Sequence, residues 1–147
     1  MRIALKQRLW ALLLGAPAWA VLGISLSLSP DPGGHGTHKQ LGLSSCSILT
    51  WTGYPCPMCG MTTTFSHMAH WEWWQALQTQ PFGVLLFIIT LVVGLAALAE
   101  LAIPKDRVMR TWQWIEKHEL WIAAGLVLGL FSGWGYKLMI WDYSIPI

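Results

Sequence analysis

The chain has 147 residues and a formal net charge of +2, and hydrophobic residues make up 54% of it. Charged residues account for only 11%, whereas soluble domains contain about 25%. This composition excludes an intrinsically disordered chain, an ordinary soluble protein and a basic nucleic-acid-binding protein. The length suffices for one domain, which we take to be residues 1–147.

Three segments hold most of the apolar residues: 9–29, 81–103 and 120–141. Each has few or no charges and reaches the length of about 20 residues that a helix needs to cross the hydrocarbon core of a bilayer. Backbone polar groups in lipid must be satisfied internally, so each segment is predicted to be a helix. The predicted fold class is an all-α integral membrane protein with three transmembrane helices in contact with the lipid bilayer.

The first segment has a second interpretation. The basic residues before it, its leucine-rich run and Ala18-Trp19-Ala20 resemble a cleavable signal peptide. Residues 21–28 stay apolar beyond that site, however, so the segment is long enough to span the membrane. This length favours an uncleaved anchor. Cleavage would leave residues 30–80 on the same side of the membrane.

Three spans place the N-terminus and the second connection on one side of the membrane, and the first loop and the C-terminus on the other. The basic residues are divided unequally between these two sides. Lysine and arginine concentrate in cytoplasmic segments, so the N-terminus and the second connection are predicted to be cytoplasmic. Residues 30–80 and the C-terminus are then external or periplasmic, and the expected location is the bacterial inner (plasma) membrane. Seven of the nine basic residues lie on the predicted cytoplasmic side: Arg2, Lys6, Arg8, Lys105, Arg107, Arg110 and Lys117.

Residues 30–80, the predicted first external loop, contain all three cysteines and four of the five histidines. Residues 29–45 are rich in Gly, Pro and Ser and are predicted to be irregular. Apolar residues recur every three or four positions in residues 61–79, which predicts one amphipathic helix along the membrane surface. Gln80-Pro81 is predicted to mark the turn into the second span.

The cysteines offer more than one kind of site. Cys56 and Cys59 are separated by two residues, a spacing that lets two thiols bind one metal ion, close a disulfide or act as a redox pair. His67 and His70 follow on one face of the predicted helix, so these four residues could bind one zinc ion, or one copper ion with a methionine assisting. Cys46 could form a disulfide with Cys56 or Cys59, add a further ligand or stay free. A helix N-terminus beside the paired thiols would lower their pKa values.

Other polar residues have simpler interpretations. His35 and His38 lie in Gly-rich chain and are predicted to be solvated. Lys137, near the outer end of the third span, is predicted to extend towards the interface or to be paired.

Tryptophans and glycines indicate what the spans contact. Nine of the 11 tryptophans, Trp134 and Trp141 among them, are predicted to anchor the helices at the membrane interfaces. Glycines recur at four-residue steps in the third span, at positions 125, 129 and 133. This spacing favours close helix contact, either within the chain or with another subunit or a second copy.

The segment from Cys56 to Pro81 resembles a known family. Cys56-Pro57-Met58-Cys59-Gly60-Met61-Thr62, followed by a tryptophan- and alanine-containing helix that ends before Pro81, is similar to a family of small bacterial membrane proteins. That family is classed as domain of unknown function 2752 and carries a Cys-Pro-x-Cys-Gly-x-Thr-Arg motif ahead of a transmembrane helix. Thr63 replaces the arginine of the motif, and Gln80 replaces the asparagine before the proline. The resemblance implies the architecture and points to Cys56 and Cys59, and it implies no reaction.

Three functions are compatible with these features. The first is a non-catalytic accessory subunit of a membrane complex, with its external loop held by a metal ion or a disulfide. The second is a copper or zinc handling protein at the external face. The third is a thiol–disulfide oxidoreductase, which is disfavoured because three cysteines cannot form the two pairs that electron-passing membrane enzymes use. The sequence favours the non-catalytic interpretation.

Overall fold

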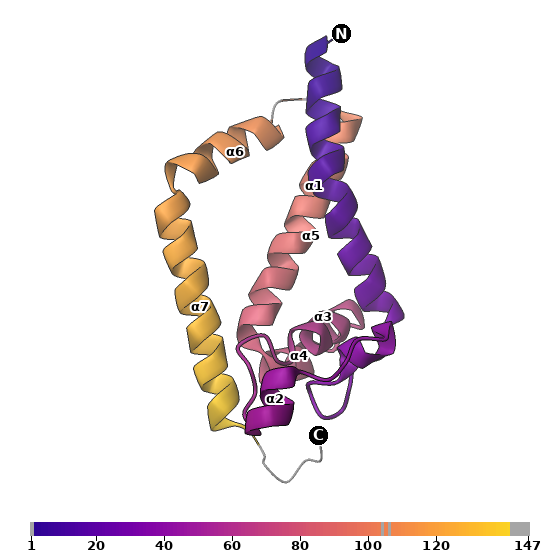
Figure 1. Cartoon of the computed structure of the whole chain (residues 1–147). Helices are drawn as coiled ribbons and strands as arrows, with labels where there is room; N and C mark the ends of the chain where they lie inside the picture. The colour runs from indigo at the N-terminus through magenta and orange to yellow at the C-terminus, as the bar shows by residue number, and fades with distance from the viewer. Residues whose placement is uncertain (1, 104, 106, 142–147) are drawn as a thin grey trace.

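A computed structural model describes residues 2–103, 105 and 107–141, and every regular element in them is helical (Figure 1). Three helices are long and apolar enough to cross a membrane, over Leu5–Ser27, Pro81–Ala102 and Glu119–Met139. The predicted fold class and its three spans are confirmed. The elements in chain order are α1 (Arg2–Ser27), the 3-10 helix η1 (Thr37–Leu41), α2 (Ser47–Thr52), α3 (Met61–Ala69), α4 (Trp73–Thr79), α5 (Pro81–Ala102), α6 (Arg107–Lys117) and α7 (Glu119–Met139).

Helices α1 and α5 form the closest pair of spans. At Gly15, a Cβ atom would lie 2.6 Å from the Cβ of Ala97, so the glycine allows the two backbones to approach. Further along, the indole Nε1 of Trp19 donates a hydrogen bond of 3.1 Å to the carbonyl of Gly94. Small residues and one interhelical hydrogen bond therefore hold this pair together, as is common between helices in lipid.

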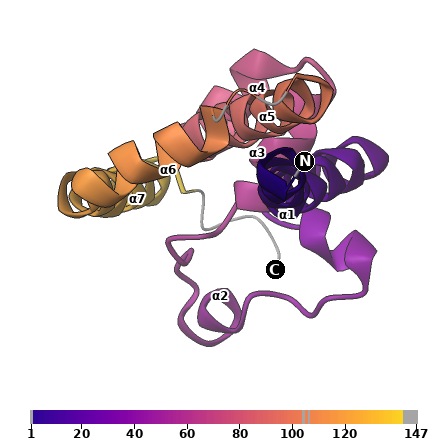
Figure 2. The same ribbon diagram turned by 90° about the horizontal axis from the view of Figure 1, so that it is seen from above.

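Helix α7 stands apart from the pair over most of its length (Figure 1). Helix α6 links it to α5 at one end, and seen from above α7 lies to one side of α1 and α5 (Figure 2). At the other end α7 meets α5, where Cβ atoms on Gly129 and Gly133 would lie less than 3 Å from Phe82. The predicted glycine contact is thus made within the chain at these two positions.

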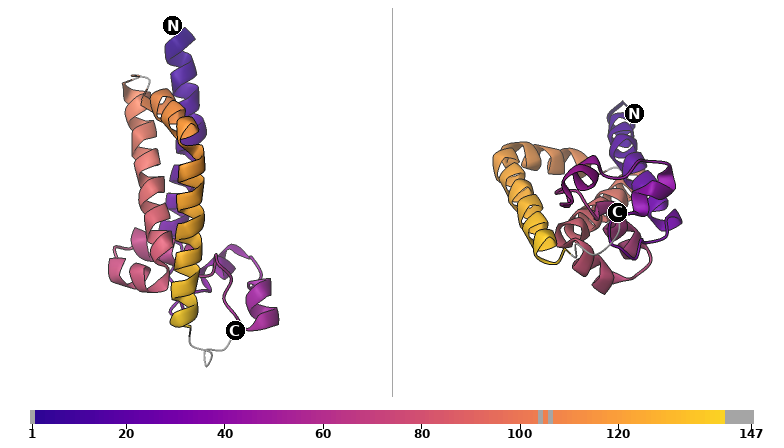
Figure 3. Two further views of the ribbon diagram at one scale, coloured as in Figure 1. Left: turned by 90° about the vertical axis from the view of Figure 1, so that its left-hand side faces the viewer. Right: turned by 60° about the horizontal axis from the view of Figure 1, so that its bottom comes forward.

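One end of the bundle carries most of the remaining structure. The end of α1, the start of α5 and the end of α7 meet there, and α2, α3 and α4 gather around them (Figure 3). We call this the loop end. Because residues 28–80 fold against three spans rather than extending from them, residues that are distant in sequence become neighbours.

The predicted single helix over residues 61–79 is wrong, because α3 and α4 are separate helices with a break between them. Trp71 adopts a left-handed conformation with φ of 66°. Two contacts between His67 and Glu72 stabilise this turn: a 2.5 Å contact between His67 Nδ1 and Glu72 Oε2, and a hydrogen bond from the Glu72 N–H to the His67 carbonyl.

These two helices combine a buried side of small residues with large exposed apolar side chains. Their buried positions are mostly small and polar, including Thr63, Thr64 and Ser66. The larger apolar side chains Trp73 and Trp74 are exposed. Of the apolar residues in the predicted pattern, Ala76 is fully buried and Phe65 packs against Phe87 of α5, so the pattern is divided between the core and the surface. Its position in the membrane interface stays a prediction.

The α1–α5 contact provides a test of the bundle. Replacing Gly15 by Leu is expected to lower the free energy of unfolding by about 1–3 kcal/mol, because the added atoms meet Ala97. Gly23→Leu is the matched control, since a Cβ atom there has nothing within 4 Å. Both variants would be unfolded by denaturing detergent and followed by circular dichroism. Equal midpoints for the two variants would contradict the packing described.

Candidate metal centre

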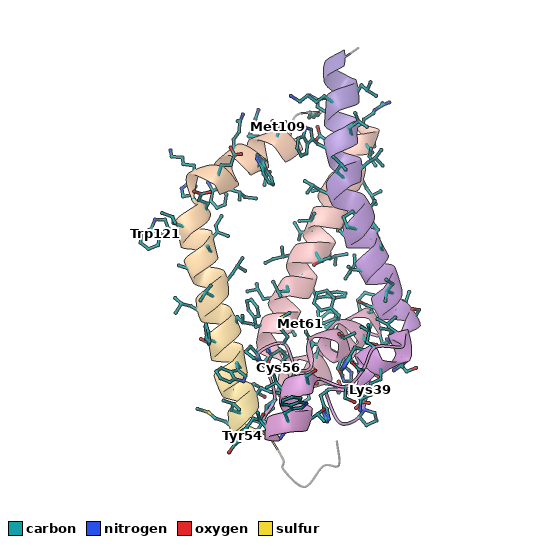
Figure 4. All side chains as sticks on the ribbon, viewed as in Figure 1. Lys39, Tyr54, Cys56, Met61, Met109 and Trp121 are labelled. Atoms are coloured by element: carbon teal, nitrogen blue, oxygen red, sulfur yellow. The ribbon has the colours of Figure 1, made fainter. Side chains whose placement is uncertain are left out.

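Three thiols converge at the loop end. Cys46 precedes α2, whereas Cys56 and Cys59 lie in the turn between α2 and α3. Their Sγ atoms all lie within 4.8 Å of one another, and all three cysteines are free. Figure 4 shows Cys56 at this end of the bundle, between the labelled residues Met61 and Tyr54. We call these three residues the thiol cluster.

The turn over residues 54–60, the proline turn, brings Cys56 and Cys59 together. The Cys59 N–H donates to the Cys56 carbonyl at 2.9 Å, and the Met61 N–H donates to the Met58 carbonyl at 3.1 Å. These two overlapping turns lead directly into α3. The second turn requires a glycine at position 60, because φ of Gly60 is 87° and a Cβ atom there would lie 2.8 Å from the carbonyl oxygen of Gly34.

Side chains from the spans hold the proline turn in place. Trp134 of α7 donates a hydrogen bond of 2.8 Å from Nε1 to the Pro55 carbonyl. Gln80, at the start of α5, donates one of 3.2 Å from Nε2 to the Pro57 carbonyl. Buried carbonyl groups need such donors, and prolines cannot donate in return. Trp134 thus has a positioning role in addition to the predicted one as an interfacial anchor.

Lys137 is the second contact from α7 to this region. Its side chain is only 5% exposed, so the predicted extension towards the interface is wrong. The Nζ atom donates to the carbonyls of Gly34 and Thr79, each at 3.3 Å, and interacts electrostatically with Cys59. The ring of Trp141 lies 5.7 Å from the ammonium group. A buried positive charge therefore stands beside the thiol cluster.

A cavity of about 230 Å³ lies against the thiol cluster, and His35 and His38 line it together with the three cysteines. His35 is 9% exposed, and its ring packs edge-on against Trp141 with centroids 5.1 Å apart. The prediction that His35 is solvated is therefore wrong. His38 is half-buried, and its Nε2 lies 3.2 Å from the Ser44 carbonyl.

Local hydrogen bonds explain why the Gly-rich segment of residues 31–37, the histidine loop, is ordered. The Asp31 carboxylate accepts from the Gly33 N–H at 2.8 Å, and the Asp31 N–H donates to Thr37 Oγ1 at 2.9 Å. Thr37 in turn donates to Thr63 Oγ1 on α3 at 2.9 Å. These bonds fold the loop onto the helix that follows the proline turn.

The predicted histidine ligands lie elsewhere. Among the described residues, the three thiols form the group of three or more ligand atoms that lie within 4.8 Å of one another, and His67 and His70 are not part of it. His67 contacts Glu72, and His70 Nδ1 lies 2.8 Å from the Ser66 carbonyl. The structure does not bring these two histidines together with Cys56 and Cys59, so metal binding by them stays a prediction.

The three thiols differ in acidity. Burial raises the pKa of Cys59 to about 12, and the neighbouring Cys56 adds to this effect. Burial also raises the pKa of Cys56, with Cys46 contributing. At Cys46 burial again opposes ionisation, but hydrogen bonds from the backbone of Leu49 and from the other two thiols outweigh it and lower the pKa. The expected lowering of the pKa at both Cys56 and Cys59 is wrong, because burial and the neighbouring thiols outweigh the backbone hydrogen bond that each of them has.

Fold and site together define a small multi-pass membrane protein with three thiols gathered at one end of its bundle. Residues 46–94, about a third of the chain and including all three cysteines, match the family described as protein of unknown function (DUF2752). This match confirms the family resemblance drawn from the sequence. The comparisons with curated proteins and with solved structures gave no match.

The order of thiol acidity can be measured. In reduced, metal-free protein, Cys46 is expected to react with iodoacetamide at the lowest pH, because its thiolate forms first, and Cys59 only as the pH approaches about 12. Mass spectrometry of the three cysteine-containing peptides over a pH series gives each profile. Denatured protein is the control, since unfolding removes the differences in environment. A folded protein whose Cys59 reacts first would contradict this order.

Proposed function

We propose that this protein binds a thiophilic metal ion, zinc or copper(I), through the thiolates of Cys46, Cys56 and Cys59. The observation that carries the proposal is the mutual proximity of the three Sγ atoms, within 4.8 Å. At a Zn–S distance of about 2.3 Å, two sulfurs on one tetrahedral ion are about 3.8 Å apart. A contraction of at most about 1 Å would therefore bring all three onto one ion.

The number of thiols favours a metal ion over a disulfide. A disulfide needs two sulfurs at about 2.05 Å and leaves the third thiol without a role. A metal ion uses all three, and both zinc and copper(I) accept thiolate ligands. The buried ammonium of Lys137 also supports the proposal, because a metal ion with three thiolates carries net negative charge.

Metal content tests the proposal. Protein purified in detergent without chelator is expected to contain about one equivalent of zinc or copper, because a single group of thiols is present. Each of Cys46→Ser, Cys56→Ser and Cys59→Ser is expected to lose most of the metal in elemental analysis. His67→Ala and His70→Ala test the predicted histidine ligands, and metal loss in them would extend the site to α3. Metal-free protein with two fewer hydrogens by mass would instead support a disulfide and the oxidoreductase alternative.

We further propose that the thiol cluster lies on the external face of a bacterial inner membrane, with the N-terminus in the cytoplasm. The support is the concentration of basic residues in the first turns of α1 and in and around α6, at the opposite end of the bundle from the cluster (Figure 1). Labelling of Cys46 in intact cells with a membrane-impermeant maleimide tests this orientation, and an external cluster is expected to react without lysis. Labelling that requires lysis would reverse it.

At the level of the whole protein, we propose a non-catalytic accessory subunit of a membrane complex. Outside the spans, residues 28–80 form only short helices and loops, and α7 leaves much of its surface open. A Cβ atom on Gly125 or Gly135 would have nothing within 4 Å, so this part of α7 is free to contact a helix of another subunit.

Co-purification tests the accessory role. Protein extracted from native membranes in mild detergent is expected to carry one or more defined partner subunits, and Gly125→Leu is expected to release them by blocking close helix contact. Gly23→Leu on α1, which also faces open space, is the matched control. A lone, monodisperse chain would contradict the proposal, and a complex of identical chains would replace it by self-association.

A further inference from the structure

We infer that His35 is the fourth ligand of the thiol cluster and that its imidazole makes the site a tetrahedral centre of three cysteines and one histidine, selective for zinc. The inference rests on the proposed function and adds to it the identity of the metal. Zinc in structural sites is four-coordinate, and three cysteines with one histidine form one of its common ligand sets. Three thiolates alone suit copper(I), which is the softer ion.

Position is the first argument. His35 lines the same cavity as Cys46, Cys56 and Cys59, and it is buried although it lies in a Gly-rich loop. Burying the polar nitrogens of an imidazole costs free energy unless each nitrogen has a partner. A metal ion in the shared cavity would be such a partner.

The orientation of the ring is the second argument. His35 Nδ1 lies 2.6 Å from the Gly33 carbonyl oxygen, which can only accept, so Nδ1 carries the hydrogen and Nε2 keeps its lone pair. Within the part of the chain that the structure describes, no donor contacts Nε2. A backbone carbonyl bound to one ring nitrogen is the arrangement that prepares the other nitrogen for a metal ion.

The surrounding contacts hold His35 against the proline turn. On one side of it, the Gly34 carbonyl accepts from Lys137 and lies against Gly60 of the turn. On the other side, Thr37 is bound to Thr63 of α3. Gly34 and Thr37, which flank His35, are thus attached to the proline turn and to α3. The ring nitrogens of His35 lie outside the group of ligand atoms within 4.8 Å of one another, so ligation requires the loop to bring the ring closer to the thiols.

Net charge favours a neutral fourth ligand. A divalent ion bound to three thiolates and one neutral imidazole carries a single negative charge, and the buried ammonium of Lys137 supplies one positive charge beside it. A carboxylate ligand would leave an excess charge in this buried region. Of the two histidines that line the cavity, His38 is the weaker candidate, because its Nε2 is already within 3.2 Å of the Ser44 carbonyl.

The experiment compares His35→Ala with His38→Ala in detergent-purified full-length protein loaded with Zn²⁺ or Cu(I). For zinc, His35→Ala is expected to weaken binding by at least about 10- to 100-fold, the loss that follows removal of a residue hydrogen-bonded to a metal ligand. His38→Ala is expected to weaken zinc binding little. Copper(I) affinity is expected to be unchanged in both variants, which also shows that the cluster is intact. X-ray absorption of the zinc form is expected to show three sulfurs at about 2.3 Å and one imidazole, the latter lost in His35→Ala.

Free imidazole separates ligation from a structural role. Added imidazole is expected to restore zinc binding to His35→Ala by entering the space left by the ring, and a misfolded variant would not respond. Zinc affinity unchanged in His35→Ala, or an imidazole signal that persists there and disappears in His38→Ala, would overturn the inference while leaving the proposed function standing. Wild-type protein that binds neither metal would instead refute the proposed function.

Discussion

The site depends on how backbone carbonyls of two irregular segments are satisfied at the loop end. The carbonyls of Pro55, Pro57 and Gly34 lie in chain that forms no regular helix, and buried carbonyls without donors are costly. Their donors are side chains of the spans: the indole of Trp134, the amide of Gln80 and the ammonium of Lys137. Because these bonds fix the proline turn and the histidine loop against each other, the thiol cluster and His35 can share one cavity.

The same contacts determine how α7 is attached. The buried residues of this helix are Gly133 and Lys137, both in the half near the loop end, and the half towards α6 is mostly exposed. Lys137 and Trp134 therefore connect α7 to the segments around the thiol cluster. A metal ion that draws the thiols together would strengthen the attraction for the Lys137 ammonium, and so would hold α7 more firmly against the bundle.

The spans were predictable because hydropathy over about 20 residues is a local property of the sequence. Cys56 and Cys59 were predictable from their spacing, whereas the approach of Cys46 depends on the path of the chain through α2. The burial of His35 was hidden for a related reason: the neighbouring Gly34 bonds to Lys137, which is 103 residues away. The break at Trp71 was missed because apolar periodicity continues through it, and periodicity does not report a left-handed residue.

The acidity of the thiols bears on when a metal ion would bind. Burial keeps Cys56 and Cys59 protonated well above neutral pH, and only Cys46 ionises more readily than an ordinary thiol. Under the proposed function, the charge of a bound ion would promote loss of the protons that burial keeps on Cys56 and Cys59. The charge of the cluster would then follow its occupancy. The carbonyls of Gly34 and Thr79 and the ring of Trp141 accommodate the buried Lys137, and negative charge on the thiol cluster would add to its stabilisation.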